Sequence, residues 1–145
     1  MTMPPADRPR RTDYGFFAPI TTRWSDNDIY GHINNVVYYS YFDTAANLVL
    51  IGAGLDLANA TVIGLVVESR CQYHAPLAYP TPLVAGVRVD KLGNRAVTYG
   101  IGIFADGLDL AAAHGHFVHV FVDRATRAPV AIPEPLRAAL AALVR

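Results

Sequence analysis

Residues 24–46 read WSDNDIYGHINNVVYYSYFDTAA and join a polar, turn-forming segment to the start of an apolar helix. Residues 25–35 are rich in Asp, Asn and Gly, which favour turns and helix caps. Beyond them, aromatic and apolar side chains recur at intervals of three and four residues, at Tyr38, Tyr41, Phe42, Ala45 and Val49. This spacing predicts a helix with one buried face. Gly52 and Gly54 predict its end, because glycine accepts the left-handed conformation of a helix C-cap.

The chain on both sides of this stretch has the pattern of β-strands. Residues 16–24 are apolar and β-branched, and Pro19 favours an edge position in a sheet. After the helix, strands are predicted at residues 61–73, 83–91, 96–104 and 108–122, and Pro133 and Pro135 open a short C-terminal helix. We expect the four consecutive strands to be joined by hairpins. This order favours an α+β domain in which a five-stranded antiparallel sheet covers the long helix.

Composition limits the classes of protein to which the chain can belong. Its 145 residues, 52% hydrophobic and 17% charged, suffice for one domain with a substantial core. The 12 basic and 12 acidic side chains cancel, which argues against a general binder of nucleic acid or of anionic membranes. No segment approaches the roughly 20 apolar residues that span a bilayer, and the single Cys71 cannot form an intramolecular disulfide. We therefore expect a soluble cytoplasmic protein with a mobile tail at residues 1–12 and one domain at residues 13–145.

Residues 24–46 also contain a continuous motif: Asp-x-Asp, two residues, Gly-His-x-Asn-Asn, and a helix carrying Tyr-x-x-Tyr-Phe-Asp-x-Ala. The motif resembles the signature of the 4-hydroxybenzoyl-CoA thioesterase-like branch of the hot-dog-fold acyl-CoA thioesterases. The strand pattern fits the same fold, so the resemblance extends over about residues 14–145. It implies a hot-dog domain that hydrolyses an acyl-CoA thioester. It also implies a homodimer with a continuous sheet, or a homotetramer, with each active site at a subunit interface.

The resemblance implies that Asp28 is the catalytic carboxylate, acting as general base on water or as nucleophile on the thioester carbonyl. A carboxylate just before a helix N-terminus is stabilised by free backbone N–H groups and by the helix dipole. The N–H groups around Asn34 and Asn35 are candidates to hold the oxyanion that forms on the carbonyl oxygen. The alternative for Asp28 is an Asx-turn or capping acid. Asp26 is expected to cap the turn or to position Asp28, because two adjacent carboxylates in the same role would repel each other.

The Gly-His-x-Asn-Asn element supplies further candidates. His32 and Asn35 join Asp28 as predicted catalytic residues, and His32 is expected to hydrogen-bond Asp28 or the substrate carbonyl; a packed histidine is the alternative. Asn34 is predicted to be the helix N-cap. Gly31 is predicted to allow a turn or a close approach of the substrate.

The predicted substrate-binding residues are Tyr30, Gly31, Asn34, Val67 and Arg95. The resemblance implies that residues 64–67 of one chain line the active site of the partner chain. It also implies that a basic residue near the turn at residues 92–94, here Arg95, contacts the phosphates of coenzyme A. A solvated turn charge is the alternative for Arg95.

The remaining acids and histidines are expected to have structural roles. Asp43 lies on the helix and is expected to support it, and Glu68 is expected to pair with Arg70. His114 and His116 share one face of the last strand, and His119 lies on the other. Because no Cys or further acid joins them at ligand spacing, a polar strand face is favoured over a metal site. We predict no metal and no cofactor.

The sequence therefore predicts a thioester hydrolase that converts acyl-CoA to a carboxylate and free coenzyme A. One alternative is an acyl-CoA-binding module that does not hydrolyse its ligand. Another is an enoyl-thioester hydratase on the same fold, in which a histidine after an aspartate, as His32 follows Asp28, performs acid–base work. The acyl group, and the choice between coenzyme A and acyl carrier protein, stay open.

Overall fold

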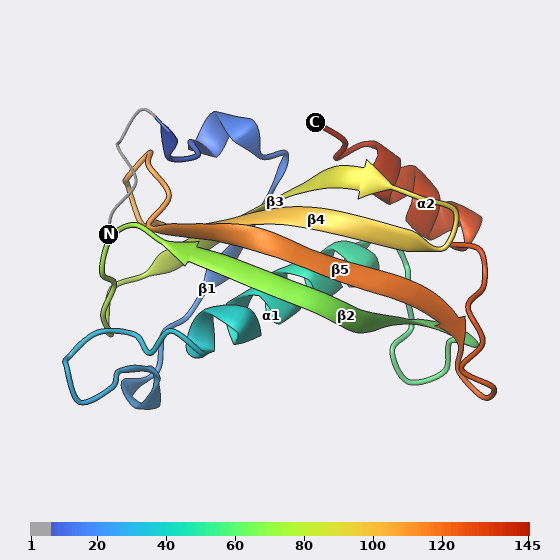
Figure 1. Cartoon of the computed structure of the whole chain (residues 1–145), viewed down its shortest axis with the longest axis horizontal. Coiled ribbons are helices and arrows are strands. Elements are labelled where there is room, and N and C mark those ends of the chain that lie inside the picture. The colour runs from blue at the N-terminus through green and yellow to red at the C-terminus, as the bar shows by residue number, and fades with distance from the viewer. Residues whose placement is uncertain (1–6) are drawn as a thin grey trace.

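The computed structural model describes residues 7–145 (Figure 1). Along the chain, helix α1 (Val37–Gly52) follows the first strand and precedes four more. The strands are β1 (Phe16–Ile20), β2 (Val62–Tyr73), β3 (Leu83–Leu92), β4 (Ala96–Ala105) and β5 (Ala113–Asp123). A short C-terminal helix, α2 (Glu134–Ala141), and two 3-10 turns, η2 (Arg11–Asp13) and η3 (Trp24–Asp26), complete the described elements. The predicted α+β class, with a long helix and a short C-terminal one, is confirmed.

All five strands form one antiparallel sheet in the order β1-β3-β4-β5-β2. β1 and β2 are therefore the two edges, which confirms the edge position predicted from Pro19. The expectation that every later strand follows its predecessor in a hairpin is wrong at one place, because β2 pairs with β5 and not with β3. The connection at residues 74–82 holds Pro76, Pro80 and Pro82, which lack the N–H donors that a hairpin ladder requires.

Two strand boundaries differ from the predicted ones. β1 ends at Ile20 and not at Trp24, because residues 24–26 turn into η3. β5 begins at Ala113 and not at residue 108, because residues 108–112 pair with the N-terminal segment. There the N–H of Arg11 donates to the carbonyl of Asp109, and the N–H of Ala111 donates to that of Pro9.

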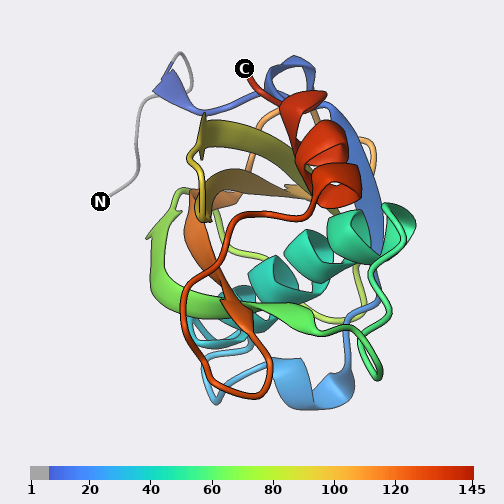
Figure 2. The ribbon, with the colours of Figure 1, turned by 90° about the vertical axis from the view of Figure 1, so that its right-hand side faces the viewer.

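Helix α1 packs its predicted apolar face into the concave side of the sheet (Figure 2). The residues Tyr38, Tyr41, Phe42, Ala45 and Val49 are all buried. Opposite them, the inward residues of the central strands include Val87, Ile101 and Phe117, which are also buried. The helix ends as predicted, with Gly54 at a φ of 101°.

The described part of the predicted N-terminal tail contacts the hairpin between β4 and β5. The guanidinium of Arg8 donates to the carbonyl of Ala111, and Arg10 forms an ion pair with Asp109 at 2.8 Å. Residues 1–6 of the tail lie outside the described residues, and the domain boundary at residue 13 stays a prediction. None of the helices within residues 7–145 is long and apolar enough to cross a membrane.

Candidate active site

Residues 22–36 form a folded loop that leads from β1 to the amino end of α1 and carries most of the predicted site residues. Two contacts within the loop hold its ends together. The N–H of Asp28 donates to the carbonyl of His32 at 2.9 Å, and Asn27 forms an isolated antiparallel β-bridge with Ile33. Gly31 has a φ of 83°, and its N–H donates to the carbonyl of Asp28. The left-handed conformation is one that glycine adopts at little cost, so the predicted turn at Gly31 is confirmed.

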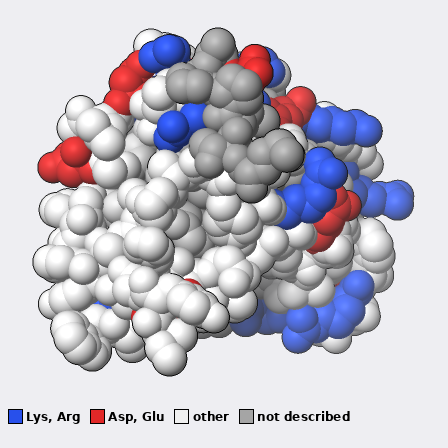
Figure 3. All heavy atoms as spheres, turned by 60° about the vertical axis from the view of Figure 1, so that its left-hand side comes forward, with Lys and Arg blue, Asp and Glu red and all other residues white. Residues whose placement is uncertain are grey.

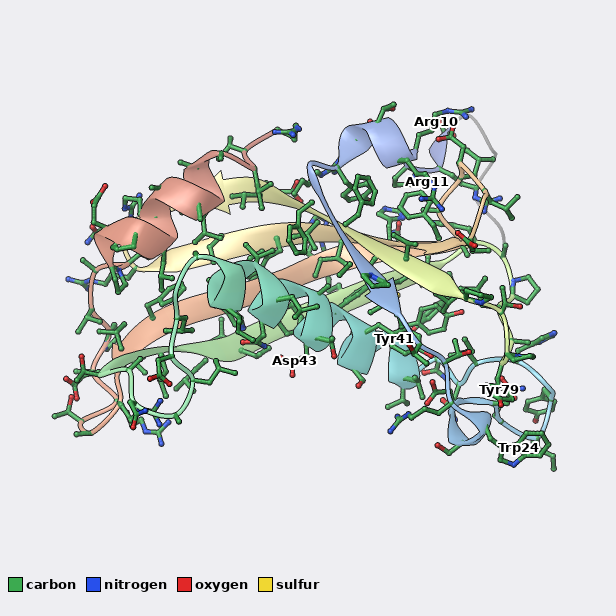
Figure 4. All side chains as sticks on the ribbon, turned by 180° about the vertical axis from the view of Figure 1, so that it is seen from behind. Arg10, Arg11, Trp24, Tyr41, Asp43 and Tyr79 are labelled. Carbon is green, nitrogen blue, oxygen red and sulfur yellow. The ribbon has the colours of Figure 1, made fainter. Side chains whose placement is uncertain are left out.

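Asp26 anchors this loop from inside the protein, where its exposed fraction is 0%. The hydroxyl of Tyr41 donates to Oδ2 at 2.7 Å, and the side chain and backbone N–H of Arg23 donate at 3.0 and 2.9 Å (Figure 4). Burial raises the pKa of the Asp26 carboxyl, but the hydrogen bonds from Tyr41 and Arg23 outweigh burial, so the pKa lies below its usual value. Asp26 is therefore an ionised structural residue that caps η3, as predicted.

Asp28 is half-buried at the surface of the same loop. Its Oδ1 accepts the N–H of Tyr30 at 2.9 Å, which is the Asx-turn geometry, and its Oδ2 has no hydrogen-bond partner among residues 7–145. The side chain lines a cavity of about 280 Å³ together with Trp24 and Ile29. The Trp24 ring meets the Tyr79 ring edge-on, with centroids 6.0 Å apart (Figure 4). Asp28 thus keeps one carboxylate oxygen free at a partly enclosed surface.

The amino end of α1 begins later than predicted. The N-cap of α1 is Val36 and not Asn34. The side-chain Oδ1 of Asn34 accepts the N–H of Val36 at 3.1 Å, and the carbonyl of Asn34 accepts the N–H of Val37. The N–H of Asn34 donates to the carbonyl of Asp26 at 2.9 Å, so the prediction that it is a free oxyanion donor is wrong. The N–H of Asn35 makes no hydrogen bond within the described chain and remains available. Asn35 is therefore the donor that the helix terminus offers.

His32 is exposed and lines two adjoining cavities. Its side chain makes no hydrogen bond to Asp28 within residues 7–145, so the predicted contact between the two is not formed. One cavity, of about 280 Å³, lies at the amino end of α1 and is also lined by Asn35, Tyr38 and Tyr73. The other, of about 370 Å³, extends from His32 along residues 75–78 towards the hairpin between β4 and β5.

Tyr73 lines the cavity at the amino end of α1 and was not predicted as a site residue from the sequence. The hydroxyl of Tyr73 donates to the carbonyl of Asn35 at 2.8 Å, and its ring meets Tyr38 edge-on at 5.1 Å. Burial raises the pKa of Tyr38 to about 12, so its hydroxyl stays protonated in the cavity. The one available signal for Tyr73 was that it carries a polar group at the end of a predicted strand, where an apolar residue also fits.

Three predicted substrate-binding residues are not gathered around Asp28 within one chain. The side chain of Tyr30 is 83% exposed, although its backbone contacts Asp28. Val67, 61% exposed, lies at a bulge in the edge strand β2. Arg95 belongs to the turn between β3 and β4, at the far end of the sheet from the loop (Figure 1). Backbone hydrogen bonds join Asp28 to Gly31 and His32, and Asp28 and Gly31 line one cavity, whereas His32 and Asn35 line a second cavity at the amino end of α1. Asn34 is hydrogen-bonded to Asp26.

The other acids occupy the structural positions predicted for them. Asp43 is exposed on the outer side of α1 and accepts a hydrogen bond from Asn47 (Figure 4). Glu68 and Arg70 pair at 3.8 Å on the surface of β2.

The histidines of β5 contact three different partners. His116 lies 3.0 Å from a carboxylate oxygen of Asp90, His114 lies 2.7 Å from His74, and the buried His119 lies 3.1 Å from the hydroxyl of Tyr99. Within residues 7–145 no three metal-ligating side chains converge on one point.

A model of the thioesterase-like superfamily matches residues 22–140, which include the loop, α1 and the whole of the later sheet. The chain belongs to the thioesterase-like superfamily. The resemblance that was inferred from residues 24–46 is thereby confirmed.

Solved structures share the fold of this chain. The PA5185 protein of Pseudomonas aeruginosa strain PAO1 is 56% identical, with a TM-score of 0.93 over 94% of this chain and 96% of that one. BH1999, a gentisyl-coenzyme A thioesterase, is 22% identical, with a TM-score of 0.76 over 86% and 99%. Slr0204 of Synechocystis, a 1,4-dihydroxy-2-naphthoyl-CoA thioesterase, is 17% identical, with a TM-score of 0.79 over 88% and 96%. The last two share the fold with this chain.

A curated relative, the uncharacterized protein YsmA of Bacillus subtilis, is 24% identical over 88 residues. The match covers 61% of this chain and 60% of that protein, so this chain matches less than two thirds of the relative's length.

Proposed function

We propose that the protein is an acyl-CoA thioesterase in which Asp28 supplies the catalytic carboxylate. The observation that carries the proposal is the free Oδ2 of Asp28 on a loop that is fastened to the amino end of α1, where the N–H of Asn35 is also free. Membership of the thioesterase-like superfamily supports the same reaction. Two structural relatives, BH1999 and Slr0204, are described as thioesterases that act on coenzyme A esters.

The chemistry requires few groups, because a thiolate leaves a tetrahedral carbon readily. In one route, Asp28 removes a proton from water as the water oxygen adds to the thioester carbonyl, and the tetrahedral intermediate expels the thiolate of coenzyme A as the carbon–sulfur bond breaks. In the other, a carboxylate oxygen of Asp28 adds to the carbonyl, the carbon–sulfur bond breaks to leave a mixed anhydride, and water hydrolyses the anhydride to the carboxylate product and free Asp28. In both routes the thiolate takes up a proton. The N–H of Asn35 donates to the oxygen on which negative charge develops, with the helix dipole behind it.

The proposed enzyme is a dimer in which β2 of one chain pairs with β2 of another. β2 is an edge strand, and its Val66 and Val67 are 46% and 61% exposed. Unpaired edges of this kind are normally covered in native proteins. Pairing of the two edges would bring the partner's Val67 towards the loop of the first chain and enclose Asp28 further. A tetramer would join two such dimers.

Substitution of Asp28 by Asn tests the proposal. We expect thiol release from a panel of acyl-CoA thioesters to fall by at least about 100-fold, since the amide cannot act as base or nucleophile. Free thiol is measured colorimetrically, and circular dichroism checks the fold. Asp43→Asn is the matched control, because Asp43 is exposed and contacts only Asn47 among the described side chains.

A folded Asp28→Asn protein with the wild-type rate would refute the role of Asp28. Tight binding of acyl-CoA without any thiol release by the wild-type protein would favour the binding module. Loss of enoyl absorbance without thiol release would favour the hydratase.

A further inference from the structure

The larger of the two cavities beside His32 combines an apolar wall with one cation. It measures about 370 Å³, and most of its lining consists of alanine, proline and leucine side chains, including Pro76, Leu108 and Leu110. The polar lining residues are Arg8, His32 and Thr81. An apolar cavity with few polar groups is the usual form of a small-molecule site, and the polar groups determine which ligand it selects.

Arg8 is held in place without an anionic partner. Its Nε and one terminal nitrogen both donate to the carbonyl of Ala111, at 2.9 and 2.7 Å, and the side chain is half-buried. Within residues 7–145 it forms no ion pair, and residues 1–6, MTMPPA, contain no acidic side chain. Nearby Arg10, in contrast, pairs with Asp109 at 2.8 Å (Figure 4). A partly desolvated guanidinium that lacks a counter-charge favours an anionic ligand.

The cavity of Arg8 adjoins the proposed catalytic site. The cavity at the amino end of α1, which Asn35 lines, shares His32, Ala75, Pro76 and Leu77 with it. These four residues form a wall that the two cavities share, so an acyl chain whose thioester carbonyl oxygen meets the N–H of Asn35 would run along Ala75, Pro76 and Leu77, past His32, to the cavity of Arg8. This path suits an acyl chain better than the pantetheine arm of coenzyme A, whose two amides require hydrogen-bond partners.

We propose that Arg8 binds a carboxylate at the far end of the acyl group, so that the preferred substrates are thioesters of dicarboxylic acids. The proposal rests on the thioesterase function proposed above and names the class of acyl group. The guanidinium presents its remaining N–H groups to the carboxylate, while the methylene groups of the acyl chain lie against the leucine and proline walls.

The test compares two thioesters of equal chain length, adipoyl-CoA and hexanoyl-CoA, which differ in the terminal carboxylate. We expect the wild-type protein to have the higher kcat/KM for adipoyl-CoA. Arg8→Gln should lower the ratio of the two kcat/KM values by about 10- to 100-fold, the usual range for a hydrogen bond to a charged group. Arg8→Lys keeps the charge without the planar fork and should give an intermediate ratio. Arg10→Gln, which removes a cation outside the cavity, is the control.

The outcomes separate this inference from the function on which it rests. An unchanged ratio in Arg8→Gln, with or without an equal loss of activity towards both thioesters, would overturn it, because Arg8 would then not distinguish the terminal carboxylate. If Arg8→Gln does not fold, the wild-type protein supplies the test. Equal kcat/KM values for adipoyl-CoA and hexanoyl-CoA would then overturn the proposal. Absence of thiol release from every thioester would instead refute the thioesterase function.

Discussion

Asp26 and Asp28 lie two residues apart on the same loop, and their surroundings give them different roles. Asp26 has no exposed surface and accepts hydrogen bonds from Tyr41 and Arg23, so every approach to its carboxylate is occupied. Asp28 is half-buried, lines a cavity and accepts one hydrogen bond through Oδ1, while its Oδ2 has no hydrogen-bond partner among residues 7–145. Only the second arrangement leaves a carboxylate that can reach a substrate.

The buried His119 predicts how the stability of the protein depends on pH. Burial lowers its pKa to about 4, and the hydroxyl of Tyr99 is its hydrogen-bond partner. Between pH 6.5 and 4 the unfolded chain binds a proton at this position and the folded chain does not, so acidification favours unfolding. We expect His119 to account for a loss of about 2 kcal/mol between roughly pH 7.5 and pH 5.

Urea unfolding at the two pH values measures this loss. His119→Gln keeps a hydrogen-bonding group near Tyr99 but cannot titrate, so its loss of stability on acidification should be smaller than that of the wild type. The pKa of His114 is also lowered to about 4, mainly by burial. His114 therefore contributes to the loss of stability on acidification in both the wild type and His119→Gln. Equal pH dependence in the two proteins would contradict a neutral His119 in the core.

At the scale of elements, the contact between β2 and β5 depends on a glycine. Gly115 lies on the inner face of β5 and pairs with Cys71. A Cβ at this position would collide with the carbonyl oxygen of Arg70 on β2 and approach a ring atom of Phe42 on α1. The absence of a side chain therefore lets the edge strand lie tightly against its neighbour while the helix fills the space beneath.

Gly115→Ala should therefore destabilise the protein by about 1–3 kcal/mol, because backbone must move to admit the methyl group. Gly52→Ala is the matched control at the end of α1, where a Cβ meets no atom within 4 Å. There the same substitution should leave stability unchanged or raise it by up to about 1 kcal/mol. Thermal unfolding of both variants measures the difference, and equal midpoints would refute the proposed collision.

At the scale of the whole molecule, several large apolar side chains are exposed on the loop at residues 22–36 and on the edge strand β2. Trp24, Ile29 and Tyr30 are 82%, 93% and 83% exposed, and Val67 on β2 is 61% exposed. Figure 3, which brings the loop end of the molecule forward, has a broad area with almost no charged side chains. Large exposed apolar side chains are typical of surfaces that a partner covers, and those on the edge strand β2 support the proposed dimer.

Sedimentation should accordingly give the mass of a dimer or tetramer, and Val67→Lys should shift the protein towards monomer. A lysine at the edge of β2 would place two like charges in the paired interface and disfavour pairing. Phe17→Lys, on the opposite edge strand β1, is the control and should leave the paired assembly intact. Thiol release should fall with dissociation if the site needs the partner chain. A wild-type monomer with full activity would refute the interface site.

The local pattern of the sequence predicted much of the fold. The period of apolar residues located α1 and its buried face, and the motif at residues 24–46 pointed to the correct superfamily. The spacing of apolar residues predicts a helix and its buried face because the same interval recurs every few residues along the chain. Strand order was a different matter: β2 pairs with β5 across forty residues of intervening chain, and no local pattern records that choice.

The loop and the amino end of α1 were also predictable as site elements, but the states of their polar groups were not. Whether the N–H of Asn34 is free depends on the carbonyl of Asp26, and Tyr73 reaches Asn35 only because the end of β2 folds back beside α1. Arg8 faces an apolar cavity for the same reason, since residues 75–78 and 105–112 meet there only in the folded chain. The sequence determined which chemical groups exist and which helix and strands they belong to. The tertiary structure decided which groups remain unpaired, because a hydrogen bond or an ion pair depends on distance in space and not on distance along the chain.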